Sequence, residues 1–392
     1  MVRGATCDVR GAMVRGAMVR GATCGVRVRR ATYVVSGFSR TVCLACAVSL
    51  ASPAVALAQQ ARPSRLAIDT VAAIDESVDL NGNYATGVVV DAVVSVGLGR
   101  GFEGIVWPIV QRLASTGGWN RDIWIATLRY ERAGPIGVRI DGGLIPAPIG
   151  LANLTVRRPH LNPTIAQPSS LFTALPALEI RGPRTNLLGA VYPFGGQVTV
   201  SGARWDVRAA LIDTSPLRRR GVFADPKPPR FANVVVGGGV TPVVGFRVGA
   251  SMTHGGWQRA GENPATTSDR DATVVTVESE FSFAYTKLSG EWVRDAIETG
   301  SGDRVASGWF VQGQQTLAPR WFVAGRVERM ASPLVLPTGV QQQRFAGAEE
   351  VLGYRLTPEL TLRAGHRARR GFGRPGFDHQ VAVSLVWWRR WI

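Results

Sequence analysis

The sequence predicts an all-β protein, a transmembrane antiparallel up-and-down β-barrel of about 16 strands with short periplasmic turns and longer extracellular loops. Three observations support this class. Beyond residue 60, apolar and polar residues alternate in segment after segment, as expected for strands with two different faces. No apolar run there approaches the ~18–20 residues of a membrane-spanning helix. All four cysteines lie within the first 46 residues, which excludes a disulfide scaffold or a cysteine-based metal site downstream.

The first 58 residues are expected to lie outside the working protein. Residues 1–37 are predicted to be a low-complexity basic extension that is disordered or follows a misassigned start, because residues 2–24 repeat a Val-Arg-Gly-Ala phrase without a hydrophobic face. A basic arm for nucleic acid is the alternative, but it would need interleaved aromatic residues. Residues 38–58 read as a signal peptide, because arginines precede an apolar segment that ends in the cleavage motif Ala56-Leu57-Ala58.

The remaining residues 59–392 are predicted to form a single outer-membrane barrel. Removing the first 58 residues takes away eight arginines and one aspartate, so the net charge falls from +17 to +10. A secreted chain of this length without cysteine is typical of the bacterial envelope.

Seventeen segments have strand character when the chain is followed in order. They are 64–76, 86–98, 102–110, 121–131, 135–145, 185–193, 196–202, 203–213, 231–239, 243–253, 272–284, 286–297, 305–316, 320–329, 341–356, 359–369 and 379–390. Because single-chain bacterial barrels have an even number of strands, we expect about 16, with one segment wrong or missed. Segment 341–356 alternates least clearly, since Glu349 and Glu350 are adjacent, and a β-bulge would explain this.

The alternation itself fits two architectures. A soluble β-sandwich would hide the apolar faces in a core, whereas a membrane barrel turns them toward lipid and keeps the polar faces in the lumen. Charges of both signs on the polar faces favour the barrel, and so do aromatic residues at strand ends. Those aromatic residues are Trp257, Tyr285, Trp321, Tyr354, Trp387, Trp388 and Trp391.

The connections between the segments are asymmetric. Tight turns are expected at Thr241-Pro242, Ala318-Pro319 and Thr357-Pro358, because proline pre-sets φ for a turn and is excluded from a central strand. Longer polar stretches lie between them, at 258–271, 299–304, 331–340 and 370–378. Short turns on one side and long loops on the other are typical of outer-membrane barrels.

The candidate functional residues are arginines, predicted to line the pore or bind anions. They are Arg157, Arg158, Arg204, Arg208, Arg247, Arg326, Arg363 and Arg367. Six of them alternate with apolar residues and would share the lumen with carboxylates such as Glu278 and Glu328. An excess of arginine favours anions. The alternative is that these arginines form structural ion pairs that brace the wall.

The longest stretch without alternation is residues 146–184, which contains seven prolines and Arg157-Arg158. An ordered loop of this length is unusual unless it has a function. It would either fold inward and narrow the pore or cover the extracellular surface. The basic segment Leu217-Arg218-Arg219-Arg220, with Lys227, is expected in an outer loop that contacts lipopolysaccharide phosphates.

One stretch resembles a known family. Gly143-Leu144-Ile145-Pro146-Ala147-Pro148-Ile149-Gly150-Leu151 is similar to the Gly-x-x-x-x-Pro-Phe-Gly segment of phosphate-selective porin O and P type barrels, with Ile149 in place of phenylalanine. The resemblance implies a member of the outer-membrane porin superfamily, a trimeric, water-filled 16-stranded barrel with an anion-preferring constriction. The chain departs from phosphate specialists in having only two lysines.

Enzyme motifs are missing from the sequence. None of the four histidines (His160, His254, His366 and His379) has the spacing of a metal site, and there is no Gly-x-Ser-x-Gly nucleophile elbow. We therefore expect no enzyme and no cofactor.

The sequence thus predicts a porin in the cell outer membrane of a Gram-negative bacterium, a passive channel for small hydrophilic solutes with a mild anion preference. Expected partners are outer-membrane lipid and lipopolysaccharide, small anionic or neutral solutes, and further copies of the chain in a homotrimer, but no nucleic acid. The alternative is a non-channel barrel that acts as a hydrolase or a surface-binding scaffold.

Overall fold

The protein is described by a computed structural model that covers residues 66–112, 117–155, 158–189, 192–218, 222–223, 228–264 and 266–391, without the side chains of 154–155 and 171–172. Residues 62–392 form one compact unit. The predicted N-terminal extension, the predicted signal peptide and Arg157 lie outside the described residues. None of the helices in the described ranges is long and apolar enough to cross a membrane.

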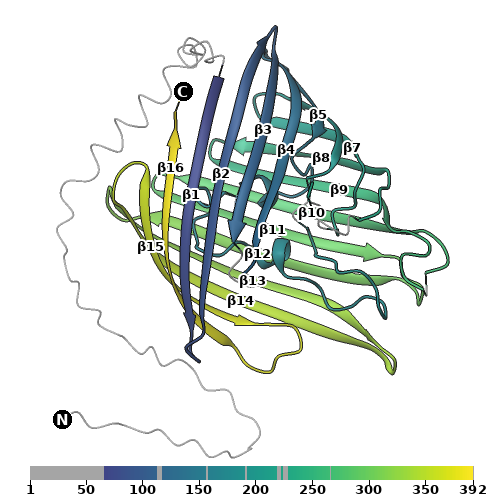
Figure 1. Ribbon diagram of the computed structural model, residues 1–392. Coiled ribbons are helices and arrows are strands. Elements are labelled where there is room, and N and C mark those ends of the chain that lie inside the picture. The colour runs from purple at the N-terminus through teal and green to yellow at the C-terminus, as the bar shows by residue number, and fades with distance from the viewer. Residues whose placement is uncertain are drawn as a thin grey trace, which may run out of the picture. The chain divides into compact units, whose positions relative to one another are not determined.

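Within the described residues the unit is a closed barrel of sixteen antiparallel strands, as predicted (Figure 1). The first eight strands are β1 (Leu66–Asp79), β2 (Tyr84–Gly99), β3 (Phe102–Arg112), β4 (Trp119–Arg132), β5 (Gly137–Leu144), β6 (Phe194–Ser201), β7 (Trp205–Ile212) and β8 (Asn233–Val243). The other eight are β9 (Phe246–Gln258), β10 (Arg270–Phe283), β11 (Thr286–Ile297), β12 (Arg304–Thr316), β13 (Trp321–Leu336), β14 (Gly339–Arg355), β15 (Leu360–Arg370) and β16 (Asp378–Arg390).

The barrel closes between its first and last strands. Each strand pairs with its neighbour in the sequence, and β1 pairs with β16 along a register that includes Ala73 opposite Val386. Figure 1 shows β1 beside β16. Because each of the sixteen described strands then has a neighbour on both sides, none of them is an edge strand, as strands that cross a bilayer require.

The two ends of the barrel differ in their connections. At one end the turns are short, for example 100–101, 244–245 and 284–285, and at the other lie the longer connections 145–193, 213–232 and 259–269. We call these the short-turn end and the long-loop end. Arg100 (φ 53°) and Ala284 (φ 49°) have the left-handed backbone that two-residue hairpin turns require.

The alternation of the strands separates an apolar outer face from a mostly polar inner face, as predicted. In β10, Val277 points outward and is 44% exposed, while its neighbours Thr276 and Glu278 are buried inside at 0% and 2%. In β7, outward Val207 and Leu211 alternate with inward Arg208 in the same way. The outward apolar side chains are therefore free to meet lipid, and the charged ones face the interior.

Four local expectations were wrong. The described residues of segment 185–193 are not in a strand, which removes the seventeenth segment. The expected loop 331–340 is instead the tip of a long hairpin, because β13 and β14 pair as far as Leu336 and Gly339. β14 has no register shift, so Glu349 points inward and Glu350 outward. The turn expected at Thr241-Pro242 lies at 244–245, next to a register shift in β8.

Two of the tryptophans expected at the membrane boundary are internal. Trp257 is 1% exposed and donates from its indole N–H to the Glu298 carbonyl at 3.0 Å. Trp388 stacks on His160 of the loop 145–193. Outward Trp321 and Tyr354, whose ring centroids lie 4.6 Å apart at the short-turn end, do match the expectation.

Candidate functional site: an inner loop across the barrel

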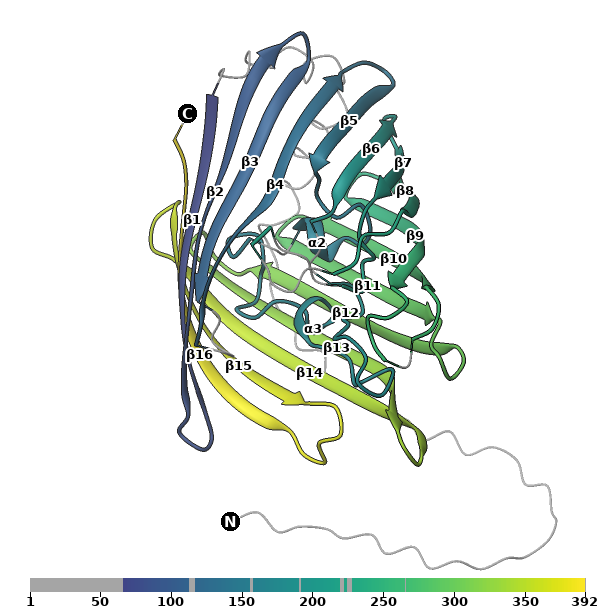
Figure 2. The same cartoon turned by 45° about the vertical axis from the view of Figure 1, so that its right-hand side comes forward.

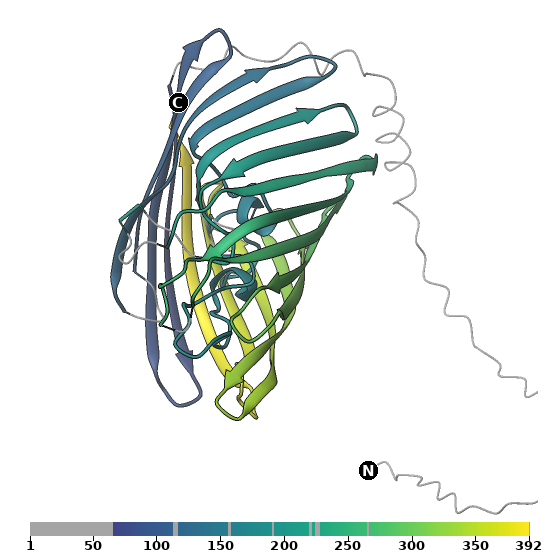
Figure 3. The same ribbon diagram turned by 90° about the vertical axis from the view of Figure 1, so that its right-hand side faces the viewer.

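The 145–193 connection between β5 and β6, here called the inner loop, runs inside the barrel. It contains two short helices, α2 (Ala152–Thr155) and α3 (Ser169–Phe172). Figure 2 shows both helices within the ring of strands, and Figure 3 shows the inner loop from the side. The sequence left open whether this loop folds inward or covers the extracellular surface. In the structure it folds inward.

Apolar contacts hold part of the inner loop against the wall. Ile149, Leu187 and Leu188 are 0–1% exposed and belong to one cluster with inward side chains of the strands, among them Val274 and Phe310. Burial of such side chains is worth ~1.5–3 kcal/mol each. Part of the inner wall beneath the inner loop is therefore apolar.

A charged clamp on β13 and β14 holds the middle of the inner loop. Arg326 donates to the Ala166 carbonyl at 2.7 Å, to Thr164 Oγ1 at 2.8 Å and to Glu349 Oε2 at 2.8 Å. The other oxygen of Glu349 accepts the backbone N–H groups of Ile165 and Ala166, each at 2.9 Å. The guanidinium and carboxylate thus bind a backbone segment from both its donor and its acceptor sides.

Arg363 on β15 binds the same segment from a second strand. Its guanidinium donates to the carbonyls of Asn162 at 3.0 Å and Thr164 at 2.8 Å, and to Ser384 Oγ at 2.8 Å. On β13, Glu328 accepts the backbone N–H and the hydroxyl of Ser169, both at 2.7 Å.

The inner loop also reaches β2, beyond the junction of β16 and β1. Arg158 donates to Asp91 Oδ1 on β2 at 2.8 Å, and its guanidinium lies 5.7 Å from the Trp107 ring centroid. The neighbouring His160 stacks on Trp388 with ring centroids 5.4 Å apart. Burial, and then the charge of Arg158, lower the pKa of His160 to about 4, so its imidazole is neutral at pH 7.

The first turn of the inner loop is held by β9 and β11. Glu291, 3% exposed on the inner face of β11, accepts the backbone N–H of Ala152 at 2.7 Å. Ser251 on β9 accepts the backbone N–H of Gly150 at 3.4 Å. The inner loop is thus bound to strands on several sides of the barrel, which makes it a crossbar and not a flap.

A second group of charges lines the wall nearer the short-turn end. Arg247 lies 2.9 Å from Asp206 and 2.9 Å from Glu278, and Arg208 lies 3.6 Å from Glu278. Arg247 is more open than the clamp residues, with 22% of its side chain exposed. This network presents both charge signs to the interior.

The described arginines among those predicted from the sequence therefore form two groups, with Arg367 and Arg204 apart from both. Arg158, Arg326 and Arg363 hold the inner loop, and Arg208 and Arg247 belong to the wall network. Arg367 is half-buried and donates to Gln380 at 2.6 Å. Arg204 is exposed in the turn between β6 and β7 and joins neither group.

Sequence reasoning missed further inward arginines, and two of them pair with one aspartate. Arg129 and Arg139 lie 2.7 Å and 3.2 Å from opposite oxygens of Asp141 on the inner face of β4 and β5. Their alternation with apolar neighbours was present in the sequence and would have identified them. Among the described residues, no three acidic, histidine or cysteine side chains are placed to hold a metal ion.

No protein-family model matches the chain, and no curated protein matches it. Several solved barrels have a similar fold. OmpF of Salmonella typhi, solved with daunomycin, is 10% identical, with a TM-score of 0.56 over 83% of this chain and 97% of that one. In-vitro folded OmpT, an outer membrane protein of Vibrio cholerae, is 10% identical with a TM-score of 0.52 over 85% and 100%. Its trimer form is also 10% identical, with a TM-score of 0.50 over 83% and 99%. The chain therefore has the fold of outer-membrane porin-type barrels.

Proposed function

We propose that the protein is a passive diffusion channel for small hydrophilic solutes in the outer membrane of a Gram-negative bacterium. The observation that carries this proposal is a crossbar, bound to β2, β9, β11 and β13–β15, inside a wall whose outer face is apolar. A crossbar of this kind narrows an aqueous bore and sets the size of the solutes that pass. The likeness to solved outer-membrane barrels supports the location, and the trimer form of Vibrio cholerae OmpT supports a homotrimer.

We further propose a mild anion preference. Among the described residues, Arg363 and Arg367 form no ion pair, while Arg326, Arg247 and Arg208 face carboxylates. Most of the predicted arginines in the described residues thus lie next to carboxylates that offset their charge. Any net preference for anions therefore comes from the few arginines that form no ion pair. This supports weak selectivity between charges and gives no support to a phosphate specialist.

The test is conductance in a planar bilayer, with purified folded protein and a salt gradient across the membrane. We expect discrete conductance steps and a reversal potential that indicates a slight preference for chloride over potassium. Arg367→Gln should shift the reversal potential toward cation preference. The matched control Arg320→Gln, which removes an exposed arginine from a short turn, should not.

Two outcomes would count against the proposal. A folded barrel that gives no steps would be sealed by its inner loop, which would favour the non-channel alternative. Conductance steps with a cation preference in the wild-type protein would support the channel proposal but contradict the proposed anion preference.

A further inference from the structure

The outer face of β13–β15 departs from the apolar pattern that a lipid-facing wall requires. Arg329 on β13 is directly opposite Ala346 on β14, which is directly opposite Arg370 on β15. Residues opposite each other on adjacent strands share a face, and Arg344 shares it too because it lies two residues from Ala346. Arg329, Arg344 and Arg370, here called the outer arginine cluster, therefore all point away from the lumen.

The outer arginine cluster occupies the long-loop half of the wall. Arg370 is the last residue of β15 at that end, and Trp309 on β12 lies opposite Arg329 in the same row. The row continues through Trp292 to Val277 and becomes apolar toward the short-turn end. Charges and tryptophans thus lie side by side in this row, a combination typical of the boundary between headgroups and acyl chains.

The cluster has no counter-charge of its own. Among the described residues, none of the three arginines forms an ion pair, and the guanidinium of Arg370 lies 5.5 Å from the centroid of the Phe377 ring. Arg329 and Arg344 are exposed. Since adjacent strands lie about 4.8 Å apart, the backbones of Arg329 and Arg370 are about 10 Å apart across β14, and their long side chains can reach one group between them.

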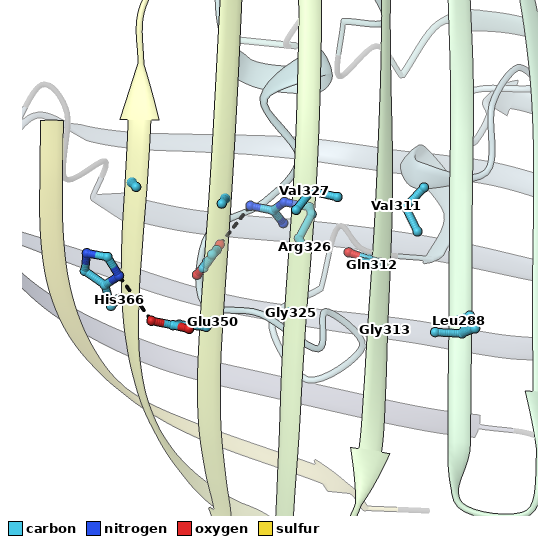
Figure 4. A pocket seen from close by; sticks show the side chains of 12 residues that line it. Leu288, Val311, Gln312, Gly313, Gly325, Arg326, Val327, Glu350 and His366 are labelled. Carbon is cyan, nitrogen blue, oxygen red and sulfur yellow. Dashed lines mark hydrogen bonds and ion pairs between the residues drawn. The ribbon is translucent and has the colours of Figure 1, made fainter. Parts of the chain in front are cut away.

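A hollow in the wall adjoins the outer arginine cluster on the side of the short-turn end. It has a volume of about 520 Å³; polar residues such as Gln312 and Glu350 contribute to its lining, but four of the lining residues have little or no side chain. These are Gly313, Gly325, Ala348 and Ala368, with Leu288, Val311 and Val327 around them. Figure 4 shows the hollow, with the hydrogen bond between His366 and Glu350 at one edge. Val327 and Ala368 are each the next outward residue after an arginine of the cluster, so the hollow begins where the cluster ends.

We propose that the outer arginine cluster and the hollow together form a binding site for a phosphate-bearing lipid of the outer leaflet, of the lipid A type. The three guanidinium groups would bind headgroup phosphate, for which their fork of donors is suited. One acyl chain would lie in the hollow against Val311 and Val327. This inference rests on the proposed outer-membrane location, because it needs the long-loop end to face the leaflet that carries such lipid.

The choice of lipid over a second copy of the chain follows from charge. Three uncompensated arginines beside an apolar hollow complement a molecule that carries phosphate and acyl chains in adjacent positions. Basic residues near a membrane surface contribute about 1 kcal/mol each to the binding of anionic lipid. Free phosphate would use the cluster alone and gain nothing from the hollow.

The test is titration of diphosphoryl lipid A into the folded, detergent-solubilised barrel, with bound lipid counted by native mass spectrometry. The combined variant Arg329→Gln, Arg344→Gln and Arg370→Gln should lose at least about tenfold in affinity. The matched control Arg132→Gln, Arg320→Gln and Arg389→Gln removes the same charge from exposed arginines at the short-turn end and should bind as wild type does. Ala348→Leu, which fills the hollow without changing charge, should also weaken binding.

Three results would overturn the proposal. The first is equal loss in the control, which would indicate a general charge effect. The second is binding of inorganic phosphate as tight as that of lipid A. The third is a cluster variant that dissociates an oligomer while its lipid affinity is unchanged, which would make this face a contact between copies. Conductance of the same samples is a separate measurement, so a sealed barrel that binds lipid A would reject the channel and keep the lipid site.

Discussion

At the scale of single residues, the arginines inside this barrel are bound before any solute arrives. Arg326 is 3% exposed and has its donors directed at Ala166, Thr164 and Glu349. Arg363, also 3% exposed, has donors directed at backbone carbonyls of the inner loop. A buried guanidinium must satisfy its donors within the protein, so burial turns a potential anion ligand into a structural clamp. Of the two interpretations of the arginines, the structural one describes these residues.

Asp295 departs from this pattern on both of its side-chain oxygens. It is 0% exposed on the inner face of β11, between Val293 and Ile297, and neither of its carboxylate oxygens has a hydrogen-bond partner among the described residues. We expect Asp295→Val to stabilise the folded barrel by about 1–3 kcal/mol, because a desolvated polar group without a partner is removed. Urea unfolding in lipid vesicles, followed by tryptophan fluorescence, measures the change.

The matched control is Asp206→Val. Asp206 lies 2.9 Å from Arg247, so its loss leaves a guanidinium without that partner and should destabilise the barrel. If the free energy of unfolding changed in the same direction in both variants, the added hydrophobicity alone would explain the effect. Whether the carboxylate has a partner would then not control stability at these sites.

His160 makes the attachment of the inner loop depend on pH. Burial and the charge of Arg158 lower its pKa from 6.5 to about 4. A released loop would bind a proton at the higher pKa, so attachment is strongest above pH 6.5 and weakens as the pH falls toward about 4. We expect faster amide exchange in residues 158–166 at pH 5 than at pH 7.5, after correction for the intrinsic exchange rate.

His160→Phe keeps a ring against Trp388 and removes the titration, so this pH effect should disappear. His254, on the outer face of β9 and hydrogen-bonded to Thr273, provides the control, and His254→Phe should leave the effect intact. An effect that survives His160→Phe would assign it to another group.

At the scale of elements, the inner loop behaves as a small internal core. Its apolar side chains pack against inward residues such as Val274 and Phe310, and its backbone is bound by Glu291, Glu349 and Arg363. The proline-rich composition indicated a long connection without strand periodicity, and that was correct. Whether this loop folds into the barrel or lies outside it could not be predicted from its sequence, because the same segment would be equally soluble outside. Its binding partners are residues of the strands, which lie far from it in the sequence.

The inner loop can be removed without breaking the sheet. Leu144 at the end of β5 is directly opposite Phe194 at the start of β6, so a two-residue Asn-Gly turn can replace residues 145–193. We expect a folded barrel with a conductance several-fold higher, because the crossbar is gone. Its unfolding temperature should fall, because Val274 and Phe310 become exposed to water.

Replacing residues 370–377 with the same turn is the control. Arg369 is directly opposite Asp378 there, and among the described residues that loop makes no hydrogen bond to the inner loop, so conductance should not change. Equal conductance in both variants would mean that the inner loop does not restrict the bore.

At the scale of the whole molecule, the outer face of the barrel wall is suited to contact with the hydrocarbon chains of lipid. Val277 points outward in the middle of a row that runs from Arg370 at the long-loop end to Val207 near the short-turn end. We expect Val277→Arg to cost about 2–4 kcal/mol of stability in lipid vesicles, since a charge at the bilayer centre loses its hydration. Gln314→Arg places the same charge on the inner face of β12 and should cost little.

Loss of heat-modifiable gel mobility reports the destabilisation, because a closed barrel resists dodecyl sulfate until it is heated. If the two variants were equally stable in lipid vesicles, the outward face would not be in contact with lipid, and the assignment of inside and outside would be wrong.

The amino-acid sequence was enough to locate sixteen strands and their two faces, though it also suggested a seventeenth, because the alternation of Val275, Val277 and Phe281 with Thr276 and Glu278 is a local property of a pleated backbone. It did not determine which arginines are free, because Arg326 and Glu349 meet Ala166 across more than 150 residues of chain. Nor did it reveal the outer arginine cluster. Register alone brings Arg329, Ala346 and Arg370 into one row, and register is a property of strand pairing that no single segment contains.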